Sequence, residues 1–224
     1  RNRYRLSANR FGHAGVFGFY PNKQITTGEG GLIVTNDEKL ASLCRSLRNQ
    51  GRDEAMHTSE GSWLRHARLG YNYRLDELSA ALGVAQLRRI DTIVEKRQSV
   101  AAAYLARLLD FDDLILPTVD PETVPSWFVF VIRLASGWSS DERDTIIANL
   151  RDHDVGAADY FPCIHLQPHY REQFGHAEGD FPIAESVSAR TIALPFHPNL
   201  SQRDIDVVVQ TLSLMLTRHS FRRT

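Results

Sequence analysis

The sequence feature that most constrains the fold is a long amphipathic stretch between about residues 75 and 109. We predict a single helix there, from Leu75 or Asp76 to about Leu109, as the longest element of the chain. A helix of this length is typical of a connection between two domains. Gly83 within it predicts close packing or a local bend. The apolar residues that recur at helical spacing are Leu78, Leu82, Ala85, Ile90, Ile93, Ala101, Tyr104, Leu105 and Leu108.

Prolines punctuate the region that follows this predicted helix. Three of them fall within residues 110–125, a composition typical of a linker. We therefore predict one domain of residues 1–109, which ends with the long helix, and a smaller α/β domain of residues 126–224. The second domain should contain a strand at 127–134, a helix from Ser140 or Asp141 to about 153, a short strand at 155–158, a helix at 181–189, a strand at 192–194 and a final helix, capped by Ser201 and Asp204, to about 218.

A second informative stretch, Gly15 to Asn36, reads GVFGFYPNKQITTGEGGLIVTN. Its apolar start predicts a strand, and a turn at Pro21 and Asn22 presents Lys23. A glycine-rich bend then leads into a returning strand. The other expectations for the first domain are a helix over 38–48 capped by Asp37, and loops at 1–14 and 49–62.

Lys23 is the residue most suggestive of chemistry. An amine becomes a nucleophile only when it loses its proton, and apolar surroundings disfavour the charged ammonium. A lysine in such surroundings could form an imine with a carbonyl compound. A lysine in a turn between strands also commonly points into solvent without any chemical role. Spacing alone leaves both interpretations open.

Four sequence blocks resemble the DegT/DnrJ/EryC1/StrS family of pyridoxal-phosphate-dependent sugar aminotransferases. FYPNKQITTGEGG, around Lys23, is similar to the cofactor-lysine segment of the family, and GYNYRLDEL, from Gly70, is similar to a second block. SWFVFVIRL at 126–134 and YFPCIHLQPHYR at 160–171 resemble later blocks in the same order. The resemblance implies an α/β protein of the fold-type I aminotransferase kind, comprising the end of the large cofactor domain and the small C-terminal domain.

The resemblance also implies roles for three residues at a pyridoxal 5'-phosphate site. Lys23 would bind the cofactor covalently and act as the general base of the 1,3-proton shift. Asn72 and Arg74 would donate hydrogen bonds to the cofactor phosphate of the neighbouring subunit, which implies a homodimer with shared active sites. From the residues alone, Asn72 could instead make a turn, and Arg74 could pair with Asp76 or Glu77.

One position departs from a common pattern of the family. Gly18 stands five residues before Lys23, where many members carry a serine whose hydroxyl bonds the cofactor phosphate. A backbone N–H could serve the same purpose, so the departure removes one side-chain contact and leaves the expected chemistry intact. We assign no side-chain role to Gly18.

His165 and Glu29 are the candidate substrate-binding residues. The resemblance places His165 in a loop of the substrate pocket, where it would bond a sugar hydroxyl or a nucleotide phosphate; a capped or buried structural histidine is the alternative. His165 and His169 have a helical spacing that zinc sites use, but Pro168 lies between them and no general-base glutamate accompanies them. We therefore expect no metal. The glycines around Glu29 predict a tight turn, because TTGEGG lacks the spacing of a phosphate loop.

Composition disfavours several other classes of protein. With 26 Lys and Arg against 27 Asp and Glu, the net charge of -1 gives no global basic field of the kind that nucleic-acid binders use. Two cysteines cannot make a disulfide framework, which fits a reducing cytoplasm. No apolar run approaches membrane-spanning length. We expect a cytoplasmic protein with neither nucleic-acid nor membrane partners.

The start of the sequence carries an expectation of its own. It has no methionine, and Lys23 follows after only 22 residues. In the family that the chain resembles, a substantial portion precedes the lysine and carries the aspartate for the ring nitrogen, the stacking aromatic residue and a phosphate-binding turn. We therefore interpret the chain as lacking that portion, and expect it to be inactive alone.

The resemblance implies transfer of an amino group, from glutamate as the amino-acid donor, to a keto group of a nucleotide-activated sugar. Such a reaction serves amino-sugar, polysaccharide or antibiotic-sugar biosynthesis. One alternative is a cofactor-dependent sugar dehydratase, but relatives of that kind replace the lysine with histidine, so Lys23 argues against it. A non-catalytic regulatory or structural role is the other alternative.

Overall fold

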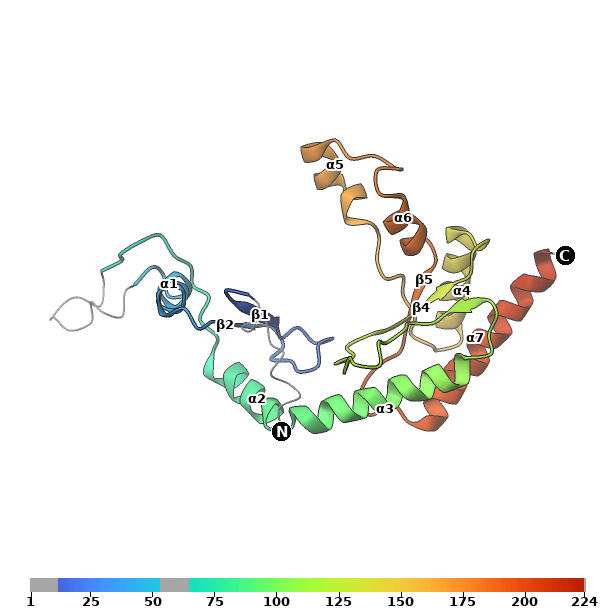
Figure 1. Cartoon of the computed structure of the whole chain (residues 1–224), viewed down its shortest axis with the longest axis horizontal. Helices are drawn as coiled ribbons and strands as arrows, with labels where there is room; N and C mark the ends of the chain where they lie inside the picture. The colour runs from blue at the N-terminus through green and yellow to red at the C-terminus, as the bar shows by residue number, and fades with distance from the viewer. Residues whose placement is uncertain (1–11, 53–64, 224) are drawn as a thin grey trace. The chain divides into compact units, whose positions relative to one another are not determined.

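The computed structural model describes residues 12–52 and 65–223, so the predicted loops at 1–14 and 49–62 lie largely outside it (Figure 1). The elements in chain order are β1 (Gly15–Gly18), β2 (Gly31–Val34), α1 (Glu38–Arg48), α2 (Glu77–Leu87), α3 (Ile90–Leu108), β3 (Leu114–Ile115), β4 (Phe130–Leu134), α4 (Ser140–Asp152), the 3-10 helix η4 (Ile164–Leu166), α5 (Pro168–Phe174), α6 (Pro182–Ser188), β5 (Thr191–Leu194) and α7 (Gln202–Arg223).

The predicted single helix over 75–109 is wrong in one respect, because it is two helices, α2 and α3. The backbone N–H of Arg88 is shared between the carbonyls of Val84 and Gln86, and the N–H of Arg89 bonds Gln86, so the helical pattern tightens into a turn. Arginine is a good helix former, so nothing in the composition at this point signals the interruption.

The chain divides into two compact units, residues 1–90 and 91–224. This division differs from the predicted linker at 110–125. The physical reason is that α3 buries Tyr104 and Leu108 in the core of the second unit, and β3 pairs there with β4. The long amphipathic stripe on α3 therefore serves the second unit.

In the first unit, β1 and β2 form an antiparallel pair with Gly15 opposite Val34 and Gly18 opposite Gly31. Helix α1 follows at the predicted residues, and the carboxylate of Asp37 caps it by accepting the N–H groups of Lys39 and Leu40 at 2.8 and 3.1 Å. Asp76 caps α2 in the same way through the N–H of Ser79. That bond lowers the pKa of the Asp76 carboxyl.

The second unit is built on an antiparallel sheet of order β3-β4-β5. Alternate residues of β4 are fully buried and pack with side chains of α3, α4, β5 and α7 in one core. Tyr104 lies at its centre, with its ring centroid 4.9 Å from that of Phe130 and its hydroxyl donating to the carbonyl of Pro195 at 2.8 Å. Burial raises the pKa of Tyr104 well above its usual value.

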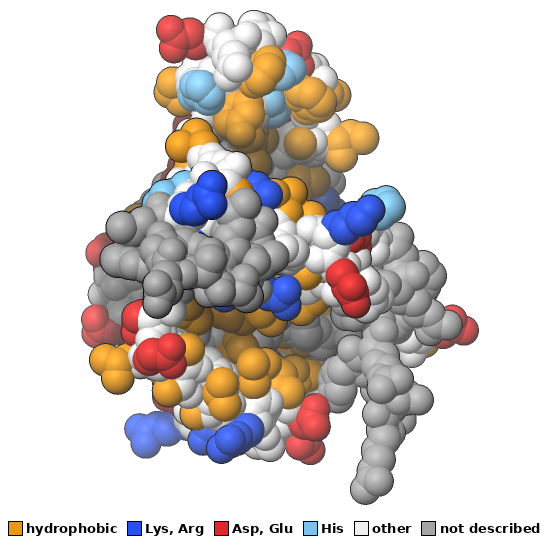
Figure 2. Space-filling view, turned by 90° about the vertical axis from the view of Figure 1, so that its left-hand side faces the viewer, with side chains coloured by type: hydrophobic (Ala, Val, Ile, Leu, Met, Phe, Trp, Pro, Cys, Tyr) orange, Lys and Arg blue, Asp and Glu red, His pale blue; other side chains and the backbone are white. Residues whose placement is uncertain are grey.

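The surface of the first unit carries many large apolar side chains. Val16, Tyr73 and Leu78 are 77%, 71% and 85% exposed, whereas in the second unit most of β4, β5 and the inward faces of α3, α4 and α7 are buried. Figure 2 shows hydrophobic side chains spread over the face that it views. None of the helices in the described ranges is both long and apolar enough to cross a membrane.

Candidate functional site

Lys23 lies in the connection between β1 and β2, as the sequence predicts. Its backbone N–H donates to the carbonyl of Tyr20 at 3.0 Å, which closes the turn, and the residue is partly buried. Phe19 and Ile25, on either side of it in sequence, are only 8% and 7% exposed. The two apolar flanks anchor the segment, so that Lys23 occupies a fixed turn.

The remainder of this connection is held by hydrogen bonds to its own backbone. The carbonyl of Phe19 accepts from the Thr27 N–H at 3.0 Å and from the Thr26 hydroxyl at 2.9 Å. The Phe19 N–H donates to the carbonyl of Gly30 at 2.9 Å, which continues the β1 and β2 pairing inward. The segment from Phe19 to Gly30 is therefore an ordered loop, which we call the lysine loop.

The predicted tight turn at the glycines is confirmed. Gly28 and Gly30 have φ angles of 81° and 143°, which side chains rarely tolerate. A Cβ on Gly30 would also lie 2.5 Å from the Thr27 hydroxyl oxygen. Glu29 between them is exposed, and within the described residues its carboxylate makes no hydrogen bond or ion pair. The substrate role of Glu29 stays a prediction.

Asn72 and Arg74 lie in a segment whose backbone pairs with the end of α1. Residue Tyr71 donates to Leu47 at 2.6 Å and accepts from Gln50 at 2.8 Å, and Asn72 forms an isolated antiparallel bridge with Asn49. The rings of Tyr71 and Tyr73 stack with their centroids 4.9 Å apart. The main chain is thus fixed while the side chain of Asn72 is exposed, and its amide has no hydrogen-bond partner in the described part of the chain.

The guanidinium of Arg74 keeps its positive charge uncompensated within the described residues. Its Nη1 donates to the amide oxygen of Asn49 at 3.0 Å, and it forms no ion pair with Asp76 or Glu77. The alternative in which Arg74 is neutralised by a neighbouring carboxylate is therefore wrong. Neither Arg74 nor Asn72 is hydrogen-bonded to Lys23.

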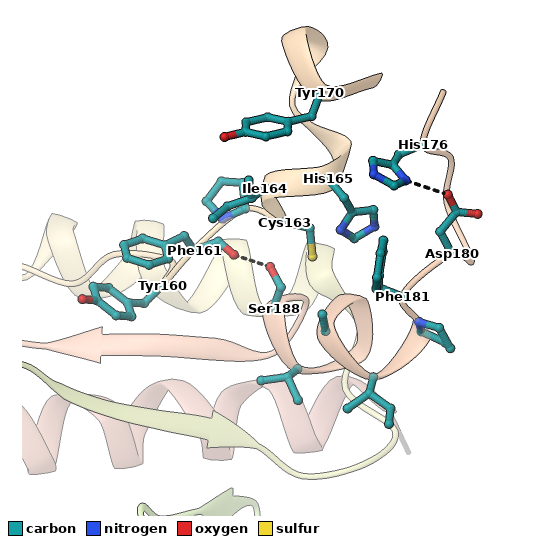
Figure 3. A pocket seen from close by; sticks show the side chains of 15 residues that line it. Tyr160, Phe161, Cys163, Ile164, His165, Tyr170, His176, Asp180, Phe181 and Ser188 are labelled. Carbon is teal, nitrogen blue, oxygen red and sulfur yellow. Dashed lines mark hydrogen bonds and ion pairs between the residues drawn. The ribbon is translucent and has the colours of Figure 1, made fainter. Parts of the chain in front are cut away.

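A cavity of about 900 Å³ lies in the second unit, between the segment 160–170 and the loop and helix of residues 176–188 (Figure 3). Its walls are mostly aromatic and aliphatic. Tyr160 and Phe161 stack at 4.1 Å on one side, and burial raises the pKa of Tyr160. His165 and His176 add polar atoms to the lining. An apolar pocket with a few polar groups is typical of a small-molecule site.

His165 is held by a carboxylate that the sequence interpretation did not identify. Its Nε2 lies 2.9 Å from Oε1 of Glu185, and the same carboxylate accepts the N–H groups of Gly179 at 2.9 and 3.0 Å and of Phe181 at 3.1 Å. These bonds, that of Gly179 first, lower the pKa of the Glu185 carboxyl. Glu185 follows Pro182 near the start of α6, a pattern that signals a helix cap and gives no indication of His165.

The two histidines of HLQPH do not share a helix. His165 belongs to η4, whereas Pro168 opens α5 and places His169 in its first turn. His176 forms a separate pair with Asp180 at 3.2 Å, and the N–H of Ala177 is the main cause of the lowered pKa of Asp180. In the ranges 12–52 and 65–223 no group of three or more side chains has the arrangement of a metal site.

Comparisons with known proteins agree with this fold. A profile of the DegT/DnrJ/EryC1/StrS aminotransferase family matches residues 7–213. The spore coat polysaccharide biosynthesis protein SpsC of Bacillus subtilis is 34% identical over 206 residues, which are 90% of this chain and 53% of SpsC. The chain belongs to the DegT/DnrJ/EryC1/StrS aminotransferase family.

Solved structures show the same fold. PseC of Helicobacter pylori, an aminotransferase involved in the biosynthesis of pseudoaminic acid, matches with a TM-score of 0.83 at 26% identity, over 92% of this chain and 53% of PseC. Spr1654 of Streptococcus pneumoniae, in a PLP-form, matches with a TM-score of 0.82 at 22% identity, over 92% and 52%. The fold is thus that of the fold-type I aminotransferases, and the chain spans about half the length of these relatives.

Proposed function

We propose that the protein carrying this chain is a pyridoxal-phosphate-dependent aminotransferase of nucleotide-activated sugars, with Lys23 as the lysine that binds the cofactor. The observation that carries the proposal is the lysine loop, where Lys23 sits in a fixed, partly buried turn within the family match. The sugar-related names of SpsC and PseC support the substrate class. Glutamate as donor follows from the family resemblance.

The residues present fit this cofactor. An amine in a fixed turn suits the aldehyde carbon, while the exposed amide of Asn72 and the uncompensated guanidinium of Arg74 suit a phosphate. The bound cofactor would supply an electron sink for the carbanion chemistry at the substrate carbon. Lys23 would accept and return the proton at that carbon through its amine.

The side chains of Asn72 and Arg74 would orient the phosphate. The backbone from Tyr71 to Tyr73 is already hydrogen-bonded to α1. The backbone would therefore lose little conformational entropy when the side chains of Asn72 and Arg74 bind an anion. Both donors carry unused N–H groups within the described residues. This arrangement supports the proposed phosphate role.

We assign substrate contacts to His165 and Glu29. The bond from His165 Nε2 to Glu185 leaves Nδ1 without a hydrogen-bond partner in the described structure, so this atom can meet a sugar hydroxyl or a nucleotide phosphate. Glu29 presents an exposed carboxylate at the rim of the lysine loop. The aromatic walls beside His165 would cover an apolar face of the substrate.

We further propose a cytoplasmic homodimer in which each site takes Asn72 from the other subunit. The first unit exposes large apolar side chains, among them Val16, Tyr73 and Leu78, which a second subunit would cover. Closed two-fold dimers are also the commonest soluble oligomers. Nucleic acid and membrane have no place in the proposal.

The test uses the full-length protein that contains this chain, with a keto-sugar nucleotide and glutamate. Formation of 2-oxoglutarate coupled to an amino sugar is the expected result, and Lys23→Ala should abolish it. A Lys39→Ala variant is the matched control, because Lys39 lies exposed on α1. Equal turnover by the Lys23→Ala variant would overturn the proposal.

A further inference from the structure

One glutamine of helix α2, Gln86, is hydrogen-bonded to the backbone of the lysine loop. The Thr26 N–H donates to Oε1 of Gln86 at 3.1 Å, and Nε2 of Gln86 donates to the Thr26 carbonyl. One side-chain amide therefore satisfies both backbone groups of one loop residue, as a neighbouring strand would do. The two residues are separated by 60 positions in the sequence.

These two hydrogen bonds fix the main chain of the lysine loop at Thr26. In the described residues, the N–H and carbonyl of Thr26 have no other hydrogen-bond partner, whereas its hydroxyl and the next N–H both turn back to Phe19. Thr26 lies three residues after Lys23. Without Gln86, two polar backbone groups in a partly buried place would lose their bonds.

Gly83 allows α2 to approach the lysine loop closely enough for Gln86 to form these hydrogen bonds. It is buried one turn before Gln86 on the same face of α2, and a Cβ there would lie 3.1 Å from Cγ2 of Thr27. Thr27 cannot easily yield, because it is 5% exposed and its hydroxyl donates to the Glu29 carbonyl at 2.5 Å. The contact between α2 and the lysine loop is therefore tightly fitted.

We propose that Gln86 is a positioning residue for Lys23: by holding both backbone groups of Thr26, it fixes the conformation of the lysine loop from α2. The inference rests on the proposed function for its link to cofactor chemistry. Gln86 would not touch the reacting atoms. Its effect would be on how readily the Lys23 amine reaches the cofactor aldehyde, since a fixed turn avoids an ordering cost at each encounter.

The experiment compares Gln86→Met with Gln98→Met in the full-length protein. Methionine keeps the length of the side chain and removes its hydrogen bonds. Gln98 is the matched control, because it is also partly buried and donates to a backbone carbonyl, that of Pro125 at 3.3 Å, in the other unit. Two quantities are measured: hydrogen–deuterium exchange of the Thr26 amide, resolved from its neighbours by overlapping peptides within 23–30, and the rate at which the apoprotein gains borohydride-trapped pyridoxal phosphate at Lys23.

We expect Gln86→Met to speed exchange at the Thr26 amide by about tenfold or more and to slow attachment at Lys23 by about tenfold, as loss of two hydrogen bonds implies. Gln98→Met should change neither. Gln86→Glu keeps the acceptor for the Thr26 N–H but loses the donor, so it should fall between wild type and Gln86→Met. This variant also keeps the test available if Gln86→Met does not fold.

The inference is overturned if Gln86→Met leaves both quantities within twofold of wild type, or if attachment slows while exchange at Thr26 stays unchanged. Failure of the proposed function has a different signature. In that case the wild type would gain no pyridoxal phosphate at Lys23, and exchange at Thr26 alone would decide whether Gln86 holds the loop.

Discussion

Tyr104 joins the helix α3 to the segment after β5 through one hydrogen bond in a dry environment. Its hydroxyl donates to the Pro195 carbonyl at 2.8 Å, and burial raises its pKa. An unfolded tyrosine titrates near pH 10, so above about that pH the unfolded chain loses this proton before the folded one does. The stability that the neutral phenol contributes is therefore present below about pH 10 and declines as the pH rises above it.

We accordingly predict that Tyr104→Phe flattens the alkaline loss of stability. At pH 7 the variant should be less stable by about 1 kcal/mol, because the Pro195 carbonyl loses its partner. Above about pH 10 the difference from wild type should shrink. Urea unfolding curves across this pH range would measure it, and a constant difference at all pH values would contradict the assignment.

The role of Arg74 can be argued only once the hydrogen-bond partners of its guanidinium are known. The sequence leaves both phosphate binding and pairing with a nearby carboxylate open, and the structure removes the second. Arg74→Gln should lower the affinity for pyridoxal phosphate by roughly ten- to a hundredfold, through loss of charged hydrogen bonds. Titration of the apoprotein gives this value. Arg89→Gln, at the exposed turn after α2, is the control that should bind as wild type does.

At the scale of elements, caps were the most informative local signals. Asp37 predicts the start of α1, and Ser201 with Asp204 predicts the start of α7, because short side chains that accept backbone N–H groups define a helix end locally. The start of α4 differs slightly: Ser139 caps it, one or two residues before the predicted Ser140 or Asp141.

Ser139 offers a direct measure of such a cap. Its hydroxyl accepts the Glu142 N–H at 3.2 Å while Glu142 accepts the Ser139 N–H at 2.8 Å. Ser139→Ala should cost about 0.5–2 kcal/mol of stability. Ser140→Ala, inside the same first turn, is the control and should change stability far less. Similar unfolding midpoints for the two variants would show that the capping box has no energetic role.

Elements set by contacts distant in sequence were predicted less well. The predicted strand at 155–158 is not a strand in the structure. It contributes one isolated antiparallel bridge, between Ala158 and Ala193 of β5, and the sheet β3-β4-β5 does not include it. The break between α2 and α3 has no glycine or proline to signal it. The sequence does not indicate Glu185 or Gln86 for the same reason. Glu185 bonds the ring of His165 and Gln86 bonds the backbone of Thr26, and both partners are distant in the sequence.

At the scale of the whole molecule, the two compact units differ in how much they bury. The second unit has its own continuous core, whereas α2 buries only Gly83 and β2 has no buried residue. A sequence pattern reports which residues are apolar, but not which unit covers them. For this reason the sequence pattern places α3 in the first domain, whereas the structure packs it into the core of the second unit.

The proposed homodimer with shared sites predicts recovery of activity on mixing two inactive variants of the full-length protein. Lys23→Ala and Asn72→Ala form hybrid dimers in which one site carries both lesions and the other carries none. Activity should return towards about a quarter of wild type if equal amounts exchange at random. The test requires Asn72→Ala to be severely impaired alone. No recovery, despite demonstrated exchange, would place Asn72 in the same site as its own Lys23.

Attachment of the cofactor to Lys23 can be measured directly, because the chain contains three lysines. Lys39 is exposed on α1, and Lys96 donates to Asn199 at 3.2 Å, so both serve as internal controls. The full-length protein is incubated with pyridoxal phosphate, reduced with borohydride, digested and analysed by mass spectrometry. We expect a stoichiometric pyridoxyl group on the Lys23 peptide and only traces on the other two. Equal labelling of all three, or an unlabelled Lys23, would contradict it.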